Sequence, residues 1–328
     1  LFFLGFGIAA GTVVNHELLS VGATDGTNSW ATAGRCEDGV LPDSTSTSNE
    51  THCILALSPT TSNTDGSAVF DSWITDGIRI NVDNDFPSAY LVTVVLIGGA
   101  GVASCYADAV DTAAILDTAI DVTGPGFEPD VVFFSNNAHL FNNNTDSNED
   151  LSFGIVVNDG SNTQRSVNHR NTTAANPSTC IEVYDTTSVG RTASSGGGAS
   201  EISAEAFDAS GFSLFTRITA TSRILAIGYL AIKLNGLSAK LVTSASPTAS
   251  GDHTITGAGF TPQFGLMLHG SAVAINTAYT DGNSEVIGIS AFTSTAAGCT
   301  AVATDDAVNP GNTESITNNI PVSLRKDS

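Results

Sequence analysis

The 328-residue sequence contains few charged residues and very few lysines. Charged residues make up 13% of it, lysine occurs only as Lys233, Lys240 and Lys326, and the formal net charge is −22 at pH 7. Phosphate backbones and anionic lipid headgroups repel such a chain, so nucleic-acid binding is disfavoured. An acidic, lysine-poor surface resists non-specific association, which predicts an extracellular or virion-surface location.

The sequence also lacks a hydrophobic run long enough to span a bilayer, which needs about 20 residues. The apolar stretch at residues 1–14 resembles the core of a signal peptide, but it has neither a basic flank nor a small-residue cleavage site. It is therefore interpreted as a strand, and no membrane span is expected.

Patterns that carry catalysis are missing as well. The histidines form no H-x-x-x-H or H-x-H pair, and none recurs at a regular interval; they are His16, His52, His139, His169, His253 and His269. The serine-rich stretch at 194–200 lacks the strand-to-helix context of a nucleophile elbow. Neighbouring carboxylates are typical of solvated turns in an acidic chain. The sequence predicts a protein that is not an enzyme.

Five cysteines occur, and they do not recur at equivalent positions, so no disulfide framework is expected. Cys36 and Cys53 flank a Ser/Thr-rich loop. A disulfide between them would stabilise the fold by about 3 kcal/mol in an oxidising compartment. Two buried free thiols are the alternative, and both remain open.

An eleven-residue pattern is present twice, as GPGFEPDVVFF at 124–134 and GAGFTPQFGLM at 257–267. Both copies share the motif GxGFxP, formed by Gly124, Gly126, Phe127 and Pro129 and by Gly257, Gly259, Phe260 and Pro262. The glycines allow positive φ, the phenylalanine is an apolar anchor, and the proline ends the preceding strand. The motif is interpreted as a turn anchored in a core. It lacks the spacing and the lysine of a phosphate-binding loop.

Other segments recur at a similar interval, which indicates an internal repeat of about 134 residues. Gly77 matches Gly211, Gly154 matches Gly288, and the apolar stretch 89–99 matches 223–233. The segment Leu4, Phe6, Gly7 and Ile8 is aligned with Leu151, Phe153, Gly154 and Ile155. This alignment divides the chain into an incomplete first repeat at 1–98, a complete repeat at 99–236 and an incomplete third repeat at 237–328.

Strand patterns dominate the sequence. Apolar and polar residues alternate at 78–82, 202–207 and 254–257, as in half-buried strands. The stretches 89–99 and 223–233 are apolar on both faces, which predicts strands covered on two sides. Residues 112–120 are the best helix candidate, and they are short. The sequence predicts an all-β fold of tandem β-sandwich or jelly-roll-like units.

The order of GxGFxP, an FGI or IGI strand, a D-x-G turn and an apolar closing strand resembles the tandem repeats of poorly characterised phage and virion structural proteins. The resemblance covers nearly the whole chain, although the first repeat lacks GxGFxP and has Ile78 where the D-x-G turn otherwise carries an aromatic residue. It implies a β-rich, non-enzymatic assembly role and no catalytic residues.

The incomplete first and third repeats have two explanations. The sequence can be a window of a longer tandem array. Alternatively, incomplete units expose strand edges that pair with a neighbouring molecule and drive head-to-tail growth. Both explanations can hold together.

Calcium is the one cofactor that the sequence suggests. Asp146, Asn148 and Asp150 occupy alternate positions of an expected loop and carry oxygen ligands of the kind that Ca²⁺ prefers. The segment lacks the glycine and glutamate of an EF-hand loop. Three N-glycosylation sequons are also present, at Asn49, Asn143 and Asn171, and all fall in expected loops.

These observations favour a structural subunit that self-assembles into an extracellular fibre or filament, or into the exterior of a phage virion. Its main partner would be another copy of itself. A carbohydrate-binding, lectin-like module with glycan ligands is the alternative, although the tryptophans and tyrosines do not recur in register.

Overall fold

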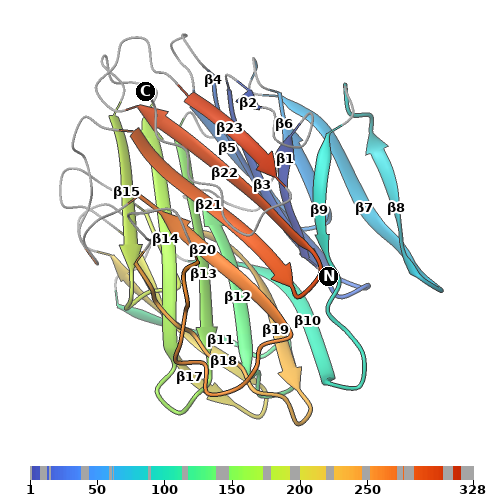
Figure 1. The fold of residues 1–328 in the computed structure, drawn as a ribbon, viewed down its shortest axis with the longest axis vertical. Coiled ribbons are helices and arrows are strands. Elements are labelled where there is room, and N and C mark those ends of the chain that lie inside the picture. Colours follow the sequence, from blue (N-terminus) through green and yellow to red (C-terminus); the bar gives the residue numbers. More distant parts are fainter. Residues whose placement is uncertain are drawn as a thin grey trace.

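The structure is a computed structural model that describes residues 2–7, 13–14, 16–37, 44–58, 61, 63–87, 90–112, 117–137, 148–172, 179–192, 200–218, 225–245, 252–271, 276, 284–305 and 313–318. Within these residues all regular structure is β, in 23 strands that form five antiparallel sheets. Figure 1 shows their arrangement. The all-β prediction is confirmed. The last residues of the helix candidate, 118–120, lie in a strand.

The first segment of the chain forms two sheets. Sheet I has the order β5-β4-β3-β1-β9, and sheet II has the order β6-β7-β8. The strands are β1 (Phe2–Gly7), β3 (His16–Thr24), β4 (Ser29–Glu37), β5 (Ser44–Asn49), β6 (Ile54–Leu57), β7 (Thr64–Ile74), β8 (Gly77–Asn84) and β9 (Leu91–Val95).

The middle segment also forms two sheets. Sheet III has the order β10-β19-β12-β13-β14-β15, and sheet IV has the order β11-β18-β17-β16. The strands are β10 (Val102–Asp111), β11 (Thr118–Val122), β12 (Val131–Asn137), β13 (Asn148–Val157), β14 (Thr163–Thr172), β15 (Thr179–Asp185), β16 (Gly190–Arg191), β17 (Ser200–Asp208), β18 (Gly211–Ile218) and β19 (Ala226–Leu234).

The last segment contributes sheet V, in the order β2-β23-β22-β21-β20. Its strands are β20 (Phe264–Gly270), β21 (Ser284–Thr293), β22 (Ala297–Asp305) and β23 (Thr313–Asn318), joined by β2 (Val13–Val14). In Figure 1 these red and orange strands cross in front of both sheet I and sheet III. One strand from the first segment therefore completes a sheet of the last segment.

The first and middle segments share a strand order. The sequence β9-β1-β3-β4-β5 in sheet I repeats β19-β12-β13-β14-β15 in sheet III, and β6-β7-β8 repeats β16-β17-β18. The hairpins β7–β8 and β17–β18 both have two-residue turns, and in both the ladder skips one residue of the first strand, Asp71 and Glu205 respectively. The middle segment has two strands more, β10 and β11.

This order corrects the alignment of the first repeat. β3 occupies the place of β13, so Gly22, and not Gly7, corresponds to Gly154. Both glycines lie where a β-carbon would collide with a main-chain carbonyl group, of Cys53 and of Val189 respectively. With this correspondence the interval from Gly22 to Gly77 is 55 residues, close to the 57 residues from Gly154 to Gly211.

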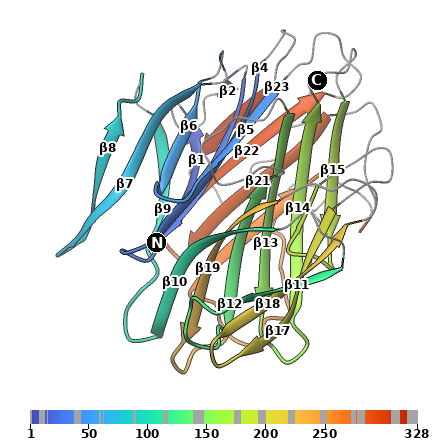
Figure 2. The same cartoon turned by 180° about the vertical axis from the view of Figure 1, so that it is seen from behind.

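Sheet III is buried on both faces, and its strands alternate between two cores. On β12, Val131 and Phe133 face one cluster while Val132 and Phe134 face the other. The second cluster fills the sandwich between sheets III and IV, which Figure 2 shows from the side of β17 and β18. The first cluster lies between sheets I, III and V and takes residues from all three segments of the chain. Two-sided cover is thus confirmed for 225–233, the described part of the predicted stretch 223–233.

Candidate functional site

The complete middle unit shows how its sandwich closes. β10 pairs with β19 from Asp111↔Ala226 to Val102↔Leu234, and β11 pairs with β18, with Val122 opposite Phe212. The hydroxyl of Thr216 donates to the carbonyl oxygen of Thr118 at 3.2 Å. At one end of the sandwich, β10 thus covers the edge of β19 in sheet III and β11 covers the edge of β18 in sheet IV.

The first GxGFxP turn follows β11 and adds to this cover. Gly126 has φ of +67°, and its N–H donates to the carbonyl oxygen of Ser210 at 2.9 Å, which joins the turn to the β17–β18 hairpin. Phe127 packs against the sandwich core, and Gly124 lies against the ring of Tyr106. The Tyr106 hydroxyl donates to Asp108 at 3.0 Å, and burial raises its pKa to about 12.

In the first segment the corresponding cover is absent from the described residues. Val94 lies two strands away from Gly22 across sheet I, and Tyr229 lies two strands away from Gly154 across sheet III. Val94 and Tyr229 therefore occupy equivalent positions. Three apolar positions of the first segment correspond in this way to positions of the middle one: Val82 to Thr216, Val94 to Tyr229 and Leu96 to Ala231. The exposed fractions are 42, 43 and 56% in the first segment against 2, 2 and 0% in the middle segment.

This open face of sheets I and II, marked by Val82, Val94 and Leu96, is the candidate functional site. On it the edges of β9 and β8 have no partner strand among the described residues. Their equivalents, β19 and β18, are paired with β10 and β11. The two-sided cover that the sequence predicts for 89–99 is incomplete in the described part of this stretch, because Val94 and Leu96 are exposed.

A second exposed region is the segment 237–262, which precedes β20. It contains no strand in its described part, although 254–257 alternates as a strand does. Leu237, Val242, Ile255 and Phe260 are exposed. Gly257 and Gly259 have φ of +102° and +78°, whereas in the first GxGFxP copy only Gly126 has positive φ, so the two turns share the conformation of the second glycine alone. The expectation that Phe260 anchors a core is wrong, because Phe260 is exposed. Phe127 packs on the core beside the β17–β18 hairpin, and among the described residues no hairpin takes that place beside Phe260.

Contacts between successive segments also recur. The turn Asp25–Asn28 (DGTN) corresponds to 159–162 (DGSN), 134 residues later in the sequence. Asp25 Oδ2 accepts from the Ala107 N–H at 3.0 Å, and Asp159 Oδ2 accepts from Lys240 Nζ at 3.0 Å. The first turn thus contacts the chain after β9, and the second turn contacts the chain after β19. The D-G-S/T-N pattern was a signal of this contact that the sequence interpretation missed.

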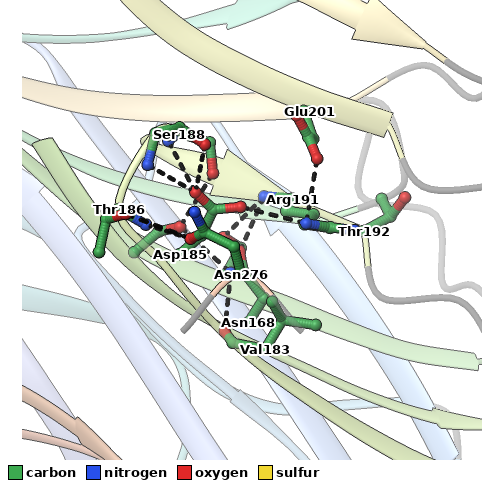
Figure 3. Close-up of polar contacts among 12 residues, drawn as sticks. Asn168, Val183, Asp185, Thr186, Ser188, Arg191, Thr192, Glu201 and Asn276 are labelled. Carbon is green, nitrogen blue, oxygen red and sulfur yellow. Dashed lines mark hydrogen bonds and ion pairs between the residues drawn. The ribbon is translucent and has the colours of Figure 1, made fainter. Parts of the chain in front are cut away.

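A polar network holds the corner where the chain leaves sheet III for sheet IV (Figure 3). Asp185 Oδ1 accepts from the Thr187 N–H at 2.7 Å, from the Thr187 hydroxyl at 2.8 Å and from the Ser188 N–H at 3.0 Å. Arg191 Nη1 lies 3.2 Å from Asp185 Oδ2 and 3.0 Å from Glu201 Oε1. Asn168 Oδ1 accepts from the Arg191 N–H at 2.8 Å. All these groups are engaged with one another, which is the pattern of a structural corner.

The first segment contains the same corner with different residues. Asn49 Oδ1 accepts from the Thr51 N–H at 2.7 Å, the Thr51 hydroxyl at 2.9 Å and the His52 N–H at 3.1 Å. His52 Nε2 lies 2.6 Å from Asp83 Oδ2 on β8, which also accepts from Ser67 at Oδ1. The His52 imidazole therefore joins the corner to sheet II and faces no cavity.

The structure places two of the three residues that the sequence suggests for a calcium site. Asn148 and Asp150 lie in β13, and Asp146 lies outside the described residues. Asp150 is buried opposite Arg170, whose Nε lies 3.5 Å from Asp150 Oδ1, so this carboxylate already faces a cation. Within the described ranges no group of three or more His, Cys, Asp or Glu side chains could hold a metal ion.

Cys36 and Cys53 form no disulfide with each other. Cys36 Sγ accepts from Asn171 Nδ2 on β14, and Cys53 Sγ donates to the Ala68 carbonyl oxygen on β7. The two thiols are thus directed to different sheets. Burial raises the pKa of Cys53 to about 12. Of the two alternatives, the structure shows buried thiols.

Two of the three sequons are buried. Asn49 and Asn171 lie in strands and are almost fully enclosed, and their amide groups hold the corner and Cys36 respectively. Neither place has room for a glycan, so the expectation of modification there is corrected. Asn143 lies outside the described residues.

Comparison with known proteins adds no identification. No family model, no curated protein and no solved structure matches the chain. In the described part of the chain, no helix is long and apolar enough to cross a membrane.

Proposed function

We propose that this protein is a non-enzymatic structural subunit that associates with further copies of itself through the open face of sheets I and II. The observation that carries the proposal is the contrast in burial between equivalent positions. Val94 is exposed where Tyr229 is buried, and Val82 is exposed where Thr216 is buried. Apolar side chains that remain in water cost about 25 cal/mol per Å² of exposed apolar surface, so covering them with another chain favours association.

The assembly served is an extracellular fibre or the exterior of a virion. The acidic, lysine-poor composition supports a location in open water, and the resemblance to phage structural repeats supports an assembly role. An exposed edge strand is a template for pairing with another chain, so β8 and β9 supply the means of growth.

The test is the concentration dependence of the native mass. Sedimentation velocity and negative-stain microscopy of the purified 328-residue chain are expected to show oligomers or filaments that grow with concentration. Val94→Lys is designed to place a charge on the open face without touching the closed sandwich, and it is expected to abolish growth. The matched control is Ala209→Lys, which adds the same charge in the exposed β17–β18 turn of the closed sandwich and is expected to leave growth unchanged. The unfolding free energy of both variants is measured as well, which separates association from folding.

Carbohydrate binding is the second candidate, and one observation favours it. Trp73 is largely exposed on sheet II, with its ring 4.8 Å from that of Phe70. Exposed aromatic rings can stack on sugars. A chain that stays monomeric at all concentrations and binds a glycan array through Trp73 would replace the assembly proposal with this one.

A further inference from the structure

We propose that copies of this protein exchange their last segment, so that strands β20–β23 of one copy pack on the first and middle segments of another. This inference rests on the proposed function and adds a second contact to it. Exchange joins chains in pairs, and the open face of sheets I and II links these pairs into larger assemblies.

Sheets I, III and V contact one another in a closed cycle. Strand β13 of sheet III packs on β4 and β5 of sheet I, and β21 of sheet V packs on β14 and β15 of sheet III. Strand β3 of sheet I packs in turn on β22 and β23 of sheet V, which Figure 1 shows across both other sheets. β3, β13 and β21 occupy the same place in their sheets. One kind of contact is therefore made three times, and the third joins the last segment to the first.

This closed cycle limits how a further copy can join. A contact between two unlike surfaces gives a ring when it returns to its starting point and a filament when it does not. Here one chain completes the ring, so the contact surfaces of the three sheets are occupied within the chain. Another copy can enter only by replacing a segment. Domain exchange is a low-cost route to such pairs, because it rebuilds the same contacts between chains.

The connection between the first and middle segments is tied into sheet III. β10 lies in this connection and pairs with β19 along its whole length. Trp30 of the first segment is fully buried, and its Nε1 donates to the carbonyl oxygen of Tyr229 on β19 at 2.7 Å. The first and middle segments are therefore expected to stay together as one body.

The connection between the middle and last segments is different. Lys240 Nζ lies 3.0 Å from Asp159 Oδ2, and its neighbours on both sides pack on the shared core, so the start of the connection stays with the middle segment. Residues 252–263, which lead into β20, contain no strand, and Phe260 is exposed. A stretch of this length reaches about 40 Å when it is fully extended. We assign the hinge of the exchange to it.

The last segment makes the same contacts in the closed chain and in the exchanged pair. The Ser271 hydroxyl donates to Glu182 Oε2 at 2.6 Å, and the Asn276 N–H donates to the carbonyl oxygen of Tyr184 at 2.8 Å. On the other side, β2 of the first segment pairs with β23. Exchange makes these contacts between chains without changing them, so the protein concentration decides between the two forms.

One contact between the first and last segments gives a sharp test. A β-carbon at Gly298 on β22 would lie 3.5 Å from the Cβ atom of Thr93 on β9. The Cβ atoms of a disulfide are about 3.5–4.5 Å apart, so cysteines at these two positions can be bridged. In a closed chain the bridge forms within one chain, and in an exchanged pair it forms between two chains.

The experiment co-expresses an affinity-tagged Thr93→Cys chain with an untagged Thr93→Ala/Gly298→Cys chain. Thr93→Ala gives the new cysteine room in its own chain, and both chains carry Cys105→Ser because Cys105 is exposed. Protein retained through the tag is oxidised mildly. A disulfide between residues 93 and 298 of different chains is expected, identified by peptide mass spectrometry with fragment ions that distinguish residue 298 from Cys299.

Two further variants are the controls. Thr93→Cys/Gly298→Cys in one chain is expected to form the bridge within monomers, which checks that the two positions can be joined. Ala209→Cys replaces Thr93→Cys as the control for chance encounters, because Ala209 is exposed in the β17–β18 turn and sheet III lies between the two cores. Its yield between chains is expected to be about tenfold lower.

The outcomes separate the two proposals. Oligomers without a 93–298 disulfide between chains, or with an equal yield through residue 209, would overturn the exchange and leave assembly through the open face standing. Val94→Lys is expected to stop growth at the exchanged pair, because Val94 lies on the open face. Exchanged pairs that never grow further in the unchanged chain would remove the open-face proposal alone. A chain that is monomeric at every concentration would remove both.

Discussion

Gly154 faces the main-chain carbonyl oxygen of Val189 so closely that a β-carbon has no room, and the same relation joins Gly22 to the carbonyl of Cys53. In each case the glycine lies on a strand of the large sheet, and the carbonyl belongs to the corner that leads into the small sheet. The separation of the two layers is thus set at this point by contact between main chains.

Gly154→Ala is therefore expected to destabilise the fold by about 3 kcal/mol or more, because a backbone collision is relieved only by moving the corner. Urea denaturation measures the loss. Gly160→Ala is the matched control: Gly160 has φ of +81° with open space around it, so only backbone strain of about 1 kcal/mol is expected. Equal losses in the two variants would contradict the contact.

Asp185→Ala should destabilise the corner by about 3–5 kcal/mol, because it removes the acceptor of three hydrogen bonds and leaves Arg191 without one of its carboxylates. Asp185→Asn retains the Oδ1 acceptor, the role that Asn49 fills in the first segment. It is expected to cost about 1–2 kcal/mol. Denaturation curves that place the two variants together would show that the turn hydrogen bonds are unimportant.

Phe127→Ala and Phe260→Ala form a matched pair from the two GxGFxP copies. Phe127 packs on a core and Phe260 is exposed. We expect the first change to lower the unfolding free energy by about 2 kcal/mol and the second to change it by less than about 0.5 kcal/mol.

Urea denaturation of the two variants measures both changes. Equal losses in the two variants would contradict the difference in burial between Phe127 and Phe260.

His269 gives a pH dependence whose sign can be worked out. Burial lowers its pKa from 6.5 to about 4, and neither ring nitrogen has a hydrogen-bond partner among the described residues. The unfolded chain therefore binds a proton first as the pH falls through this window. Stability is fully present above pH 6.5 and decreases by up to about 3 kcal/mol towards pH 4.

His269→Leu is expected to remove this part of the pH dependence, because it keeps an apolar side chain against Gly288 and has no group to titrate. The measurement is the difference in unfolding free energy between the two chains at several pH values from 4 to 7. A difference that does not vary with pH would mean that His269 is hydrated in the folded chain.

The sequence misplaced the first repeat for a physical reason. The residues around Gly7 (LGFGIA, 4–9) resemble those around Gly154 (LSFGIV, 151–156) more closely than do the residues around Gly22 (LSVGAT, 19–24), so the sequence favoured Gly7. What distinguishes them is a contact with the carbonyl of Cys53, which is distant in sequence. The sequence did not reveal that the corner occurs in both segments, because Asn49 and Asp185 are different residue types that share only a side-chain acceptor oxygen.

The sequence by itself determined the all-β fold, the strands at 202–207 and in the described part of 223–233, and the positive φ of Gly126, Gly257 and Gly259. These features depend on local periodicity and on the steric freedom of single residues. Tertiary structure decided which side chains are covered. Phe127 and Phe260 share the motif GxGFxP, and Tyr229 and Val94 lie in apolar strands at equivalent places of their sheets, yet Phe127 packs on a core and Tyr229 is buried while Phe260 and Val94 are exposed. Burial depends on the strands that lie alongside, and in the middle segment those strands, β10 and β11, are distant in sequence from β19 and β18.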